Sequence, residues 1–350
     1  MNESNIYREN NTVFARYEIL RDGGVWDEMY SVGAAEIQNI STSALKMSLQ
    51  GTFCRPQKSV NFLTDRIRAV LNINGTDYNK GVFIVTTSEE LGGTFGERMN
   101  IEAYSVLYLA QRSKLEGVYT IPAGTNYITA IQTLLLESGI TEYVAEETSL
   151  VMATDRQDWE EGTSRLDVIN ELLAEINYNS AWPDLDGKIH LTKYTPPSNA
   201  NIKHTYRQGE YSVLTPEYRA STDLFGKPNV FKCICDNPDL DAPLVAVSVN
   251  EDPNSKFSTV SLGARILYLE RVDNVPDQAT LQERADNLRI KSMQTTQEVE
   301  FTTALMPGHE TYDTIALDNG EITGIYTETE WRATMDASGL MVHRGKRVIE

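Results

Sequence analysis

The sequence predicts an α+β fold that is mainly β, in which two antiparallel β-domains flank a small helix-plus-hairpin α/β insert domain. Apolar and polar residues alternate through much of the first third. A capped amphipathic helix, a tight turn and a short strand occupy residues 162–193, and a proline-rich linker then leads back to strand-like sequence. We expect an N-terminal arm of unknown role at residues 1–34, the first β-domain at residues 35–116 and the insert domain at residues 117–195. A linker at residues 196–204 then leads to the second β-domain with one helix at residues 205–350.

The composition limits the classes of function. The chain has 350 residues, of which 41% are hydrophobic and 23% charged, as in soluble globular proteins of two to four domains. It has no apolar run of about 18 residues and no apolar secretory signal, so we expect no membrane insertion. The formal charge of −19 argues against stable nucleic-acid binding, because phosphate backbones are bound mainly by Lys and Arg. An acidic surface can serve solubility or face a conduit for DNA or protein, and the sequence leaves both open.

The first β-domain is expected to contain several consecutive strands. Residues 67–73 alternate between apolar and polar side chains, residues 74–77 form a turn, and residues 81–85 form the return strand of a hairpin. Residues 99–104 alternate in the same way after the glycine-rich segment 91–98, which we interpret as a hairpin loop. The pattern predicts antiparallel strands with one face exposed to water.

The insert domain begins where the period becomes that of a helix. Residues 128–135 place four apolar side chains on one helix face, and Gly139 can end this helix in a left-handed conformation. A second helix has capping-box spacing at Ser164 and Asp167. Its buried side is expected to consist of Leu166, Ile169, Leu172, Leu173 and Ile176. Residues 184–187, Asp-Leu-Asp-Gly, then form a turn that leads into a hairpin.

Paired prolines and small polar residues mark a domain boundary at residues 195–201. Beyond it, residues 229–235 and 244–249 have strand patterns. A helix is expected from Asp277 to about Met293, followed by an alternating strand at residues 297–305. These elements predict a second β-domain that carries a single helix.

Cysteine and histidine give little support to a metal site or a cofactor. We interpret the cysteines as buried or half-buried free thiols of a reducing compartment, since the chain has no CxxC spacing: Cys54, Cys233 and Cys235. The two later cysteines are expected on the same face of one strand. The histidines are scattered along the sequence without a ligand motif: His190, His204, His309 and His343. We expect no catalytic, metal-binding or cofactor-binding residues.

Paired carboxylates offer the main argument for an enzyme. Asp184 with Asp186, or Glu160 with Glu161, are the candidate acid/base pairs, but glycoside chemistry needs carboxyl groups roughly 5 to 9.5 Å apart across a cleft. We interpret them instead as turn and loop residues. The chain has neither GxSxG nor a phosphate-binding GxxxxGK[ST] loop. The tryptophans are too dispersed for a sugar platform and are expected in domain seams or interfaces: Trp26, Trp159, Trp182 and Trp331.

The order of domains, together with three segments, resembles a known family. The segments are residues 104–112, residues 164–192, and residues 285–317, in which Pro307 and Asp313 match a family pattern of apolar-Pro, Gly-Asp and a strand. Tyr312 stands where that pattern usually has Gly. Over residues 45–334 the chain is similar to the baseplate hub proteins of contractile phage tails, including PBSX-like prophage elements and phage-tail-like bacteriocins.

The resemblance implies two tail-tube-like β-domains per subunit and a homotrimer, which presents six similar β-domains around one axis. Such a structural hub joins the hexameric tail tube to the trimeric spike as a symmetry adaptor, without catalysis, and encloses a lumen for DNA or protein. The implied partners are further copies of this chain, the tube ring, the spike and other baseplate proteins. The implied location is the tail or baseplate of a phage or phage-tail-like particle, assembled in the bacterial cytoplasm.

From the net charge we expect the lumen wall to be polar and acidic. The alternative functions are a tail-tip cell-wall hydrolase and a receptor-binding or adhesion module.

Overall fold

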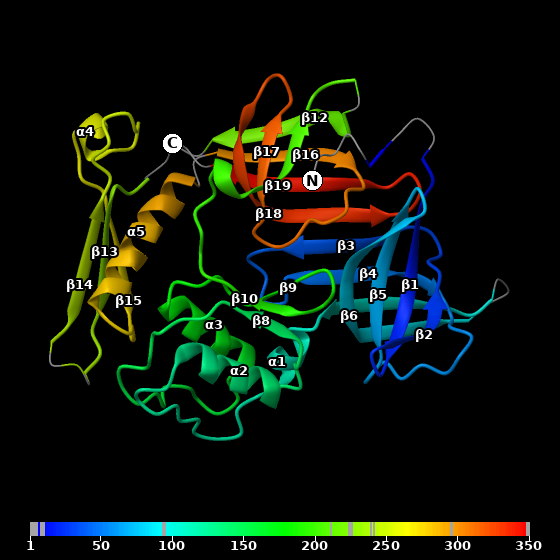
Figure 1. Cartoon of the computed structure of the whole chain (residues 1–350), viewed down its shortest axis with the longest axis horizontal. Helices are drawn as coiled ribbons and strands as arrows, with labels where there is room; N and C mark the ends of the chain where they lie inside the picture. The colour runs from blue at the N-terminus through cyan, green and yellow to red at the C-terminus, as the bar shows by residue number, and fades with distance from the viewer. Residues whose placement is uncertain are drawn as a thin grey trace.

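A sheet of 13 strands runs through most of the molecule (Figure 1). The computed structural model describes residues 6–7, 11–92, 96–210, 212–222, 227–238, 240, 242–294 and 297–347. Two three-stranded sheets and five short or medium α-helices complete the described part of the chain. The fold is therefore α+β and mainly β, as the sequence predicts.

The strands of the first β-domain are β1 (Val13–Arg21), β2 (Gly24–Met29), β3 (Ala35–Ile40), β4 (Met47–Cys54), β5 (Arg66–Ile73), β6 (Thr76–Leu91) and β7 (Arg98–Ser105). The insert domain contains α1 (Tyr108–Arg112), α2 (Tyr127–Glu137), β8 (Tyr143–Ala145), α3 (Arg165–Glu175), β9 (Trp182–Pro183) and β10 (Ile189–Leu191).

The remaining elements follow a 3₁₀ turn at Asn199–Asn201. They are β11 (Ile202–Arg207), β12 (Leu214–Thr222), β13 (Val230–Cys235), β14 (Leu244–Val249), α4 (Thr259–Leu262), β15 (Leu267–Val272), α5 (Gln278–Gln294), β16 (Gln297–Ala304), β17 (Thr314–Asp318), β18 (Thr323–Met335) and β19 (Leu340–Arg347).

The two β-domains are joined edge to edge. Strand β18 pairs with β3 in antiparallel register from Glu330 opposite Ile40 to Met335 opposite Ala35. The order across the large sheet is β12-β16-β19-β18-β3-β4-β7-β6-β5-β1-β2, while β17 pairs with β18 and β11 with β17. One cluster of buried apolar side chains includes Leu49 and Phe83 of the first β-domain and Phe301 and Trp331 of the second. The β-domains thus share a sheet and a core.

The first β-domain begins earlier than the sequence pattern indicated. Residues 1–34 were expected to form an arm, but β1 and β2 are strands of the large sheet, and β1 pairs along its length with β5. Tyr17 and Ile19 are fully buried in the shared core. Strand β11 also begins at Ile202, inside the expected linker.

Residues 227–294 contain a separate small sheet within the range expected to be one β-domain. Strands β14, β13 and β15 form it, with β13 and β15 parallel, and α5 packs on one face at the left end of Figure 1. Cys233 and Cys235 of β13 are buried in one cluster with Leu281 and Ala285 of α5. The second β-domain is therefore interrupted by this unit. Cys54 is exposed, so the expectation that all three thiols are buried or half-buried is wrong for this residue.

The insert domain has the helices that the sequence indicates. Helix α3 starts at the N-cap Ser164, whose hydroxyl accepts a hydrogen bond from the backbone N–H of Asp167. Gly139 follows α2 with φ of +81°, as expected for a left-handed cap. The turn at residues 184–187 leads into β10, and Gly187 approaches Val82 of β6. A second cluster of buried apolar side chains holds this domain together, and Ile84 of β6 is part of it.

Adding a methyl group at Gly187 should disturb the contact between the insert domain and the first β-domain. Its φ is +88°, and a Cβ would lie 2.8 Å from the Cβ of Val82. Gly162 has the same φ of +88° with open space around it, so Gly162→Ala is a matched control. We expect Gly162→Ala to cost about 1–2 kcal/mol in the free energy of unfolding. Gly187→Ala should cost a further ~1–3 kcal/mol through overpacking. Equal urea midpoints for the two variants would contradict this packing.

Candidate functional site

Eight strands form a continuous antiparallel surface that we call the wall. It consists of β12, β16, β19 and β18 from the second β-domain, and of β3, β4, β7 and residues 84–91 of β6 from the first. Each neighbouring pair in this series is antiparallel. Since side chains alternate along a strand, one face of the wall covers the shared core and the other is polar. Each β-domain contributes four strands.

A ladder of opposite charges crosses the polar face of the wall. Arg344 of β19 donates to Glu300 of β16 at 2.8 Å and to Glu330 of β18 at 2.9 Å. These carboxylates raise the pKa of the Arg344 guanidinium, and the hydrogen bond that Arg344 donates to Glu300 is the largest cause. On either side, Arg219 of β12 lies 4.0 Å from Glu300, and Arg332 of β18 lies 3.4 Å from Glu330.

The ladder continues over the seam between the β-domains. Arg332 lies 3.5 Å from Glu36 of β3, and Gln38 of β3 donates to Glu330 at 3.0 Å. Ion pairs of this exposed kind contribute little stability singly, but directly opposed charges favour one strand register over its neighbours. The ladder therefore helps to fix how the two β-domains meet.

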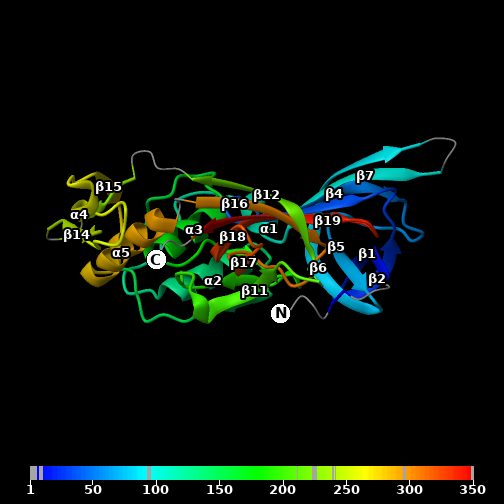
Figure 2. The same ribbon diagram turned by 90° about the horizontal axis from the view of Figure 1, so that it is seen from above.

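Both ends of the wall have open edges. Among the described residues, no strand pairs with the outer side of β12 or with the side of residues 84–91 that faces away from β7. Strand β5 stops pairing with β6 at Phe83, and the rest of the β6–β7 pair extends past the end of β5 (Figure 2). Unpaired edges are templates for further strands, and a soluble chain carries them at a risk of aggregation.

Behind the wall, three of the four histidines meet in the core of the second β-domain. The Nδ1 atoms of His309 and His343 lie 2.7 and 2.6 Å from the two carboxylate oxygens of Glu328, which is fully enclosed. The Tyr206 hydroxyl lies 2.5 Å from His309 Nε2, and the Thr303 hydroxyl 2.9 Å from His343 Nε2. Burial lowers the pKa of His343 to about 4 and the pKa of His309 well below its usual value.

The third histidine is stacked against this group. The ring of His204 lies 3.7 Å from that of His309, and its Nε2 is 3.2 Å from a carboxylate oxygen of Asp313. Its Nδ1 is buried without a hydrogen-bond partner. Sequence reasoning missed this cluster because its members come from β11, β19 and the loop before β17, and spacing along the chain carries no sign that they meet.

The cluster has the geometry of a hydrogen-bond network. Ligand atoms of His204, His309 and Asp313, and those of His309, Glu328 and His343, lie within 4.8 Å of one another. However, the contacts to Glu328 are 2.6 and 2.7 Å, whereas two ligands bound tetrahedrally to zinc at 2.0–2.1 Å are about 3.3 Å apart. The parallel rings of His204 and His309 also do not aim their nitrogen lone pairs at one point.

Lys80 of β6 connects the first β-domain to this network. Its side chain is fully buried, donates to the Met306 carbonyl at 2.9 Å and lies 4.5 Å from the ring centre of Trp331. Burial lowers the pKa of Lys80 to about 8, while the charge of Glu328 opposes this shift. A buried ammonium is costly unless it has such partners. Lys80 therefore ties β6 to the loop between β16 and β17.

That loop also contacts the insert domain. Tyr312 has a left-handed backbone with φ of +69°, the conformation that favours the Gly found at this place in the family pattern. Its hydroxyl lies 2.8 Å from Ser180 Oγ and 3.3 Å from the Ser41 carbonyl. Next to it, Thr311 accepts from Asn39 at 2.9 Å. The turn geometry is thus kept despite the tyrosine, whose ring joins all three parts of the chain.

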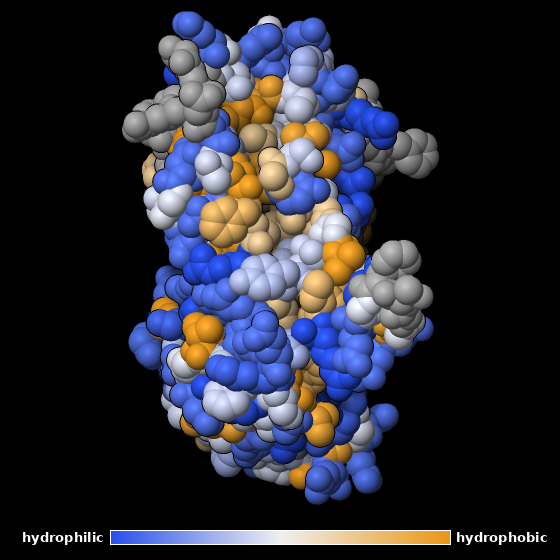
Figure 3. Space-filling view, turned by 90° about the vertical axis from the view of Figure 1, so that its right-hand side faces the viewer, coloured by the Kyte–Doolittle hydropathy of each residue, from blue (hydrophilic) through white to orange (hydrophobic). Residues whose placement is uncertain are grey.

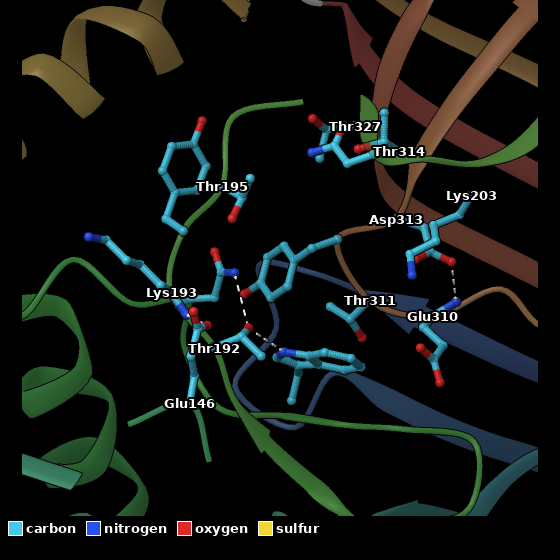
Figure 4. A pocket seen from close by; sticks show the side chains of 15 residues that line it. Glu146, Thr192, Lys193, Thr195, Lys203, Glu310, Thr311, Asp313, Thr314 and Thr327 are labelled. Atoms are coloured by element: carbon cyan, nitrogen blue, oxygen red, sulfur yellow. Dashed lines mark hydrogen bonds between the residues drawn. The ribbon is translucent and has the colours of Figure 1, made fainter. Parts of the chain in front are cut away.

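A cavity of about 370 Å³ lies beside this junction, between the insert domain and the second β-domain. Figure 4 shows Glu146 and Lys193 on one side and Glu310 and Asp313 on the other. Glu146 accepts from the Lys193 backbone N–H at 2.8 Å, and Asp313 accepts from that of Glu310 at 2.9 Å. Each of these two carboxylates therefore accepts a backbone hydrogen bond within its own domain.

The carboxylate pairs named from the sequence lie elsewhere. Asp184 accepts from the backbone N–H groups of Asp186 and Lys188, each at 2.9 Å, and lies 3.0 Å from His190 Nε2. Burial works against ionisation of Asp184, but His190 and the backbone hydrogen bonds together lower its pKa. Asp184 is therefore the organising residue of a turn. Glu160 and Glu161 lie in the exposed segment before α3.

The tryptophans occupy four separate environments. Trp331 is in the shared core, Trp182 lines the cavity, and Trp159 packs on Arg156 in the insert domain. Trp26 of β2 is partly exposed between Arg21 and Lys58. The end of the molecule that carries the first β-domain is mainly hydrophilic, with apolar patches along its middle (Figure 3).

Comparison with known proteins shows what this fold is. By sequence, no protein-family model and no curated protein matches the chain. By structure, it is similar over 95% of its length to 97% of a tail protein from Neisseria meningitidis, with a TM-score of 0.67 and 13% identity. It is also similar to a 43 kDa tail protein of prophage MuSo2 from Shewanella oneidensis. That match covers 95% of this chain and 98% of the tail protein, with a TM-score of 0.64 and 11% sequence identity.

A third similar structure is an Escherichia coli component of the type VI secretion system, itself described as similar to the T4 bacteriophage tail proteins gp27 and gp5. The match covers 95% of this chain and 77% of that protein, with a TM-score of 0.55 and 10% sequence identity. The chain therefore has the fold of these phage tail proteins, in line with the resemblance in the sequence. In the described residues, no helix is long and apolar enough to cross a membrane.

The buried histidines predict a loss of stability in acid. In the unfolded chain a histidine has a pKa near 6.5, whereas in the folded chain the pKa of His343 is about 4. Neutral His343 therefore contributes fully to the free energy of unfolding above pH 6.5, and this contribution is lost as the pH falls to about 4. For this residue the loss is ~3 kcal/mol. Burial raises the pKa of Glu328, which offsets part of the loss from the two histidines. Urea unfolding from pH 7 to 4 should show a shallower decline in His343→Gln, and equal slopes would refute this account.

The hydrogen-bond interpretation of the cluster predicts that chelation has no effect. The chain purified without added metal should unfold at the same temperature before and after dialysis against EDTA, because its buried network needs no ion. Zinc or another transition metal retained at one equivalent per chain, with a lower unfolding temperature after its removal, would show that the cluster is a metal site.

Proposed function

We propose that the chain is a structural baseplate hub, which assembles as a homotrimeric ring and joins a hexameric tail tube to a trimeric spike. The observation that carries this proposal is the wall, to which each β-domain contributes four strands. Three copies present six such four-stranded units around one axis, which matches a six-fold tube ring on one side. The fold shared with tail proteins supports the same function.

The polar face of the wall is suited to line a lumen. A channel through which DNA or protein passes needs a hydrophilic surface without strong attraction. Carboxylates and arginines alternate along the ladder, so its charge is close to balanced. The net charge predicts an acidic lumen wall, and within the ladder each carboxylate has an arginine beside it.

We propose that the hub has no catalytic activity. Asp184 and Asp186 serve a turn, and the carboxylates Glu146 and Asp313 beside the cavity accept backbone hydrogen bonds. A tail-tip hydrolase would instead need an acid and a base in unequal environments, facing each other across an accessible cleft. The proposed location is the baseplate of a phage or phage-tail-like particle after assembly in the bacterial cytoplasm, with the tube ring, the spike and other baseplate proteins as partners.

The oligomeric state tests this function. Light scattering of the purified full chain, alone and mixed with the spike protein encoded beside it, should show particles with three copies of the chain in at least one of the two conditions. Alone, this is three times the mass of the chain; with the spike, the mass of the bound spike is added. The ring should then bind a tube ring on one face. A monomer in both conditions would reject the hub, and activity against cell walls would then favour the hydrolase.

A further inference from the structure

Aromatic rings and small polar groups together line the cavity between the insert domain and the second β-domain. Its volume of about 370 Å³ lies in the range of pockets that hold small molecules, and such pockets are often found between domains. The lining includes the rings of Trp182, Tyr194 and Tyr312, with the side chains of five threonines and two asparagines. Rings offer apolar faces, whereas hydroxyl and amide groups can donate and accept hydrogen bonds. The cavity therefore suits a ligand that has both kinds of surface.

Two of these rings are held in place by the protein. The ring of Trp182 stacks on His190 with the centroids 4.4 Å apart, and its Nε1 donates to Thr192 Oγ1 at 3.2 Å. Tyr312 keeps a left-handed backbone, which is unfavourable for a bulky side chain and is retained where that side chain has a role. Its hydroxyl is hydrogen-bonded to Ser180, so the ring is fixed beside the cavity. Rings fixed in this way lose little entropy when a ligand binds.

The charges around the cavity favour a neutral ligand. Three carboxylates and two ammonium groups line it: Glu146, Glu310, Asp313, Lys193 and Lys203. Burial, followed by the charge of Asp313, raises the pKa of Glu310, so a further carboxylate would be unfavourable here. A cation would have to compete for the aromatic rings, because Lys291 Nζ already lies 4.1 Å from the centre of the Tyr194 ring. Neither sign of charge is therefore favoured in a ligand.

One carboxylate oxygen in the lining is available to a ligand. The side chain of Asp313 is only 9% exposed, and its Oδ2 accepts from the Glu310 backbone N–H and lies 3.2 Å from His204 Nε2 (Figure 4). Among the described residues, Oδ1 of Asp313 has no hydrogen-bond partner. Polar atoms of buried side chains are normally hydrogen-bonded, so this oxygen is a position at which a ligand hydroxyl can donate.

A sugar in the pyranose form has the matching surfaces. Hydroxyl groups around its rim donate and accept hydrogen bonds, and the C–H groups on its faces pack against aromatic rings. We propose that the cavity binds one neutral sugar unit, with Trp182 and Tyr312 against its C–H groups and Asp313 Oδ1 accepting from a hydroxyl. This site goes beyond the hub function and does not depend on the ring. Because the sugar contacts both domains, its binding stabilises their junction.

Saturation-transfer NMR on the full chain tests whether the cavity binds sugars. The probes are N-acetylglucosamine, a unit of cell-wall glycan, the hexoses glucose and galactose, which occur in surface polysaccharides, and tetramethylammonium as a cation. We expect transfer to at least one sugar and none to tetramethylammonium, and the sugar that binds most tightly distinguishes the two sources. With that sugar bound, hydrogen exchange should slow at residues 192–195 and 310–314, on both sides of the cavity, and stay unchanged at residues 35–40.

Substitutions at Tyr312 separate binding from structure. Tyr312→Gly removes the ring at a φ of +69° that suits glycine, and it should weaken sugar binding by about tenfold or more. Tyr312→Phe keeps the ring and loses the hydrogen bonds of the hydroxyl, so binding should stay within about twofold although the chain unfolds at a lower temperature. The matched control is Asp22→Gly, which replaces an exposed residue of positive φ outside the cavity and should leave binding unchanged.

Several outcomes would overturn the site. Transfer to none of the sugars, or sugar binding as strong in Tyr312→Gly as in the unmodified chain, would show that the cavity is not a sugar site. Binding of tetramethylammonium alone would assign the cavity to ammonium ligands. Slower exchange only at residues outside the cavity would place the sugar elsewhere. The oligomeric state is a separate question, since a monomer that binds sugar rejects the hub and keeps the site.

Discussion

The antiparallel pairing of β18 with β3 is the constraint on which the rest of the structure depends. It joins two sheets that would otherwise each end in an open edge, and it places Trp331 opposite Asn39 at the boundary of the two β-domains. Because side chains alternate along each strand, one register places the apolar side chains of both domains toward the shared core and their polar side chains on the polar face of the wall. A shift by one residue would reverse both faces of one domain relative to the other.

Buried polar groups reinforce this seam at some energetic cost. Lys80 of the first β-domain donates a hydrogen bond to the Met306 carbonyl of the second. The carboxylate of Glu328 on β18 is hydrogen-bonded to both His309 and His343. Removing such groups from water is expensive, so they specify one arrangement more than they add stability. In the proposed hub, this specificity would keep the two β-domains in one continuous wall.

Local patterns explain why some elements could be predicted and others could not. The alternation at residues 67–73 and the caps at Ser164 and Gly139 are signals within short segments, and the structure has these elements. Strand β1 alternates equally well, with Tyr17 and Ile19 facing the core, but its partner β5 lies far along the chain, so the pattern gave no sheet to join. The small sheet was missed because β13 and β15 pair in parallel across a long connection.

The candidate site depends even more on distant contacts. The ladder brings together Glu36, Glu330 and Arg344 only once the register is set, and the histidine cluster draws on several separate strands and loops. Hydrogen exchange at residues 35–40 and 330–335 tests most directly whether the two β-domains form one wall. We predict that amides of the seam exchange as slowly as those in the middle of the β4–β7 pair. Exchange as fast as at the open edge of β12 would contradict the continuous wall.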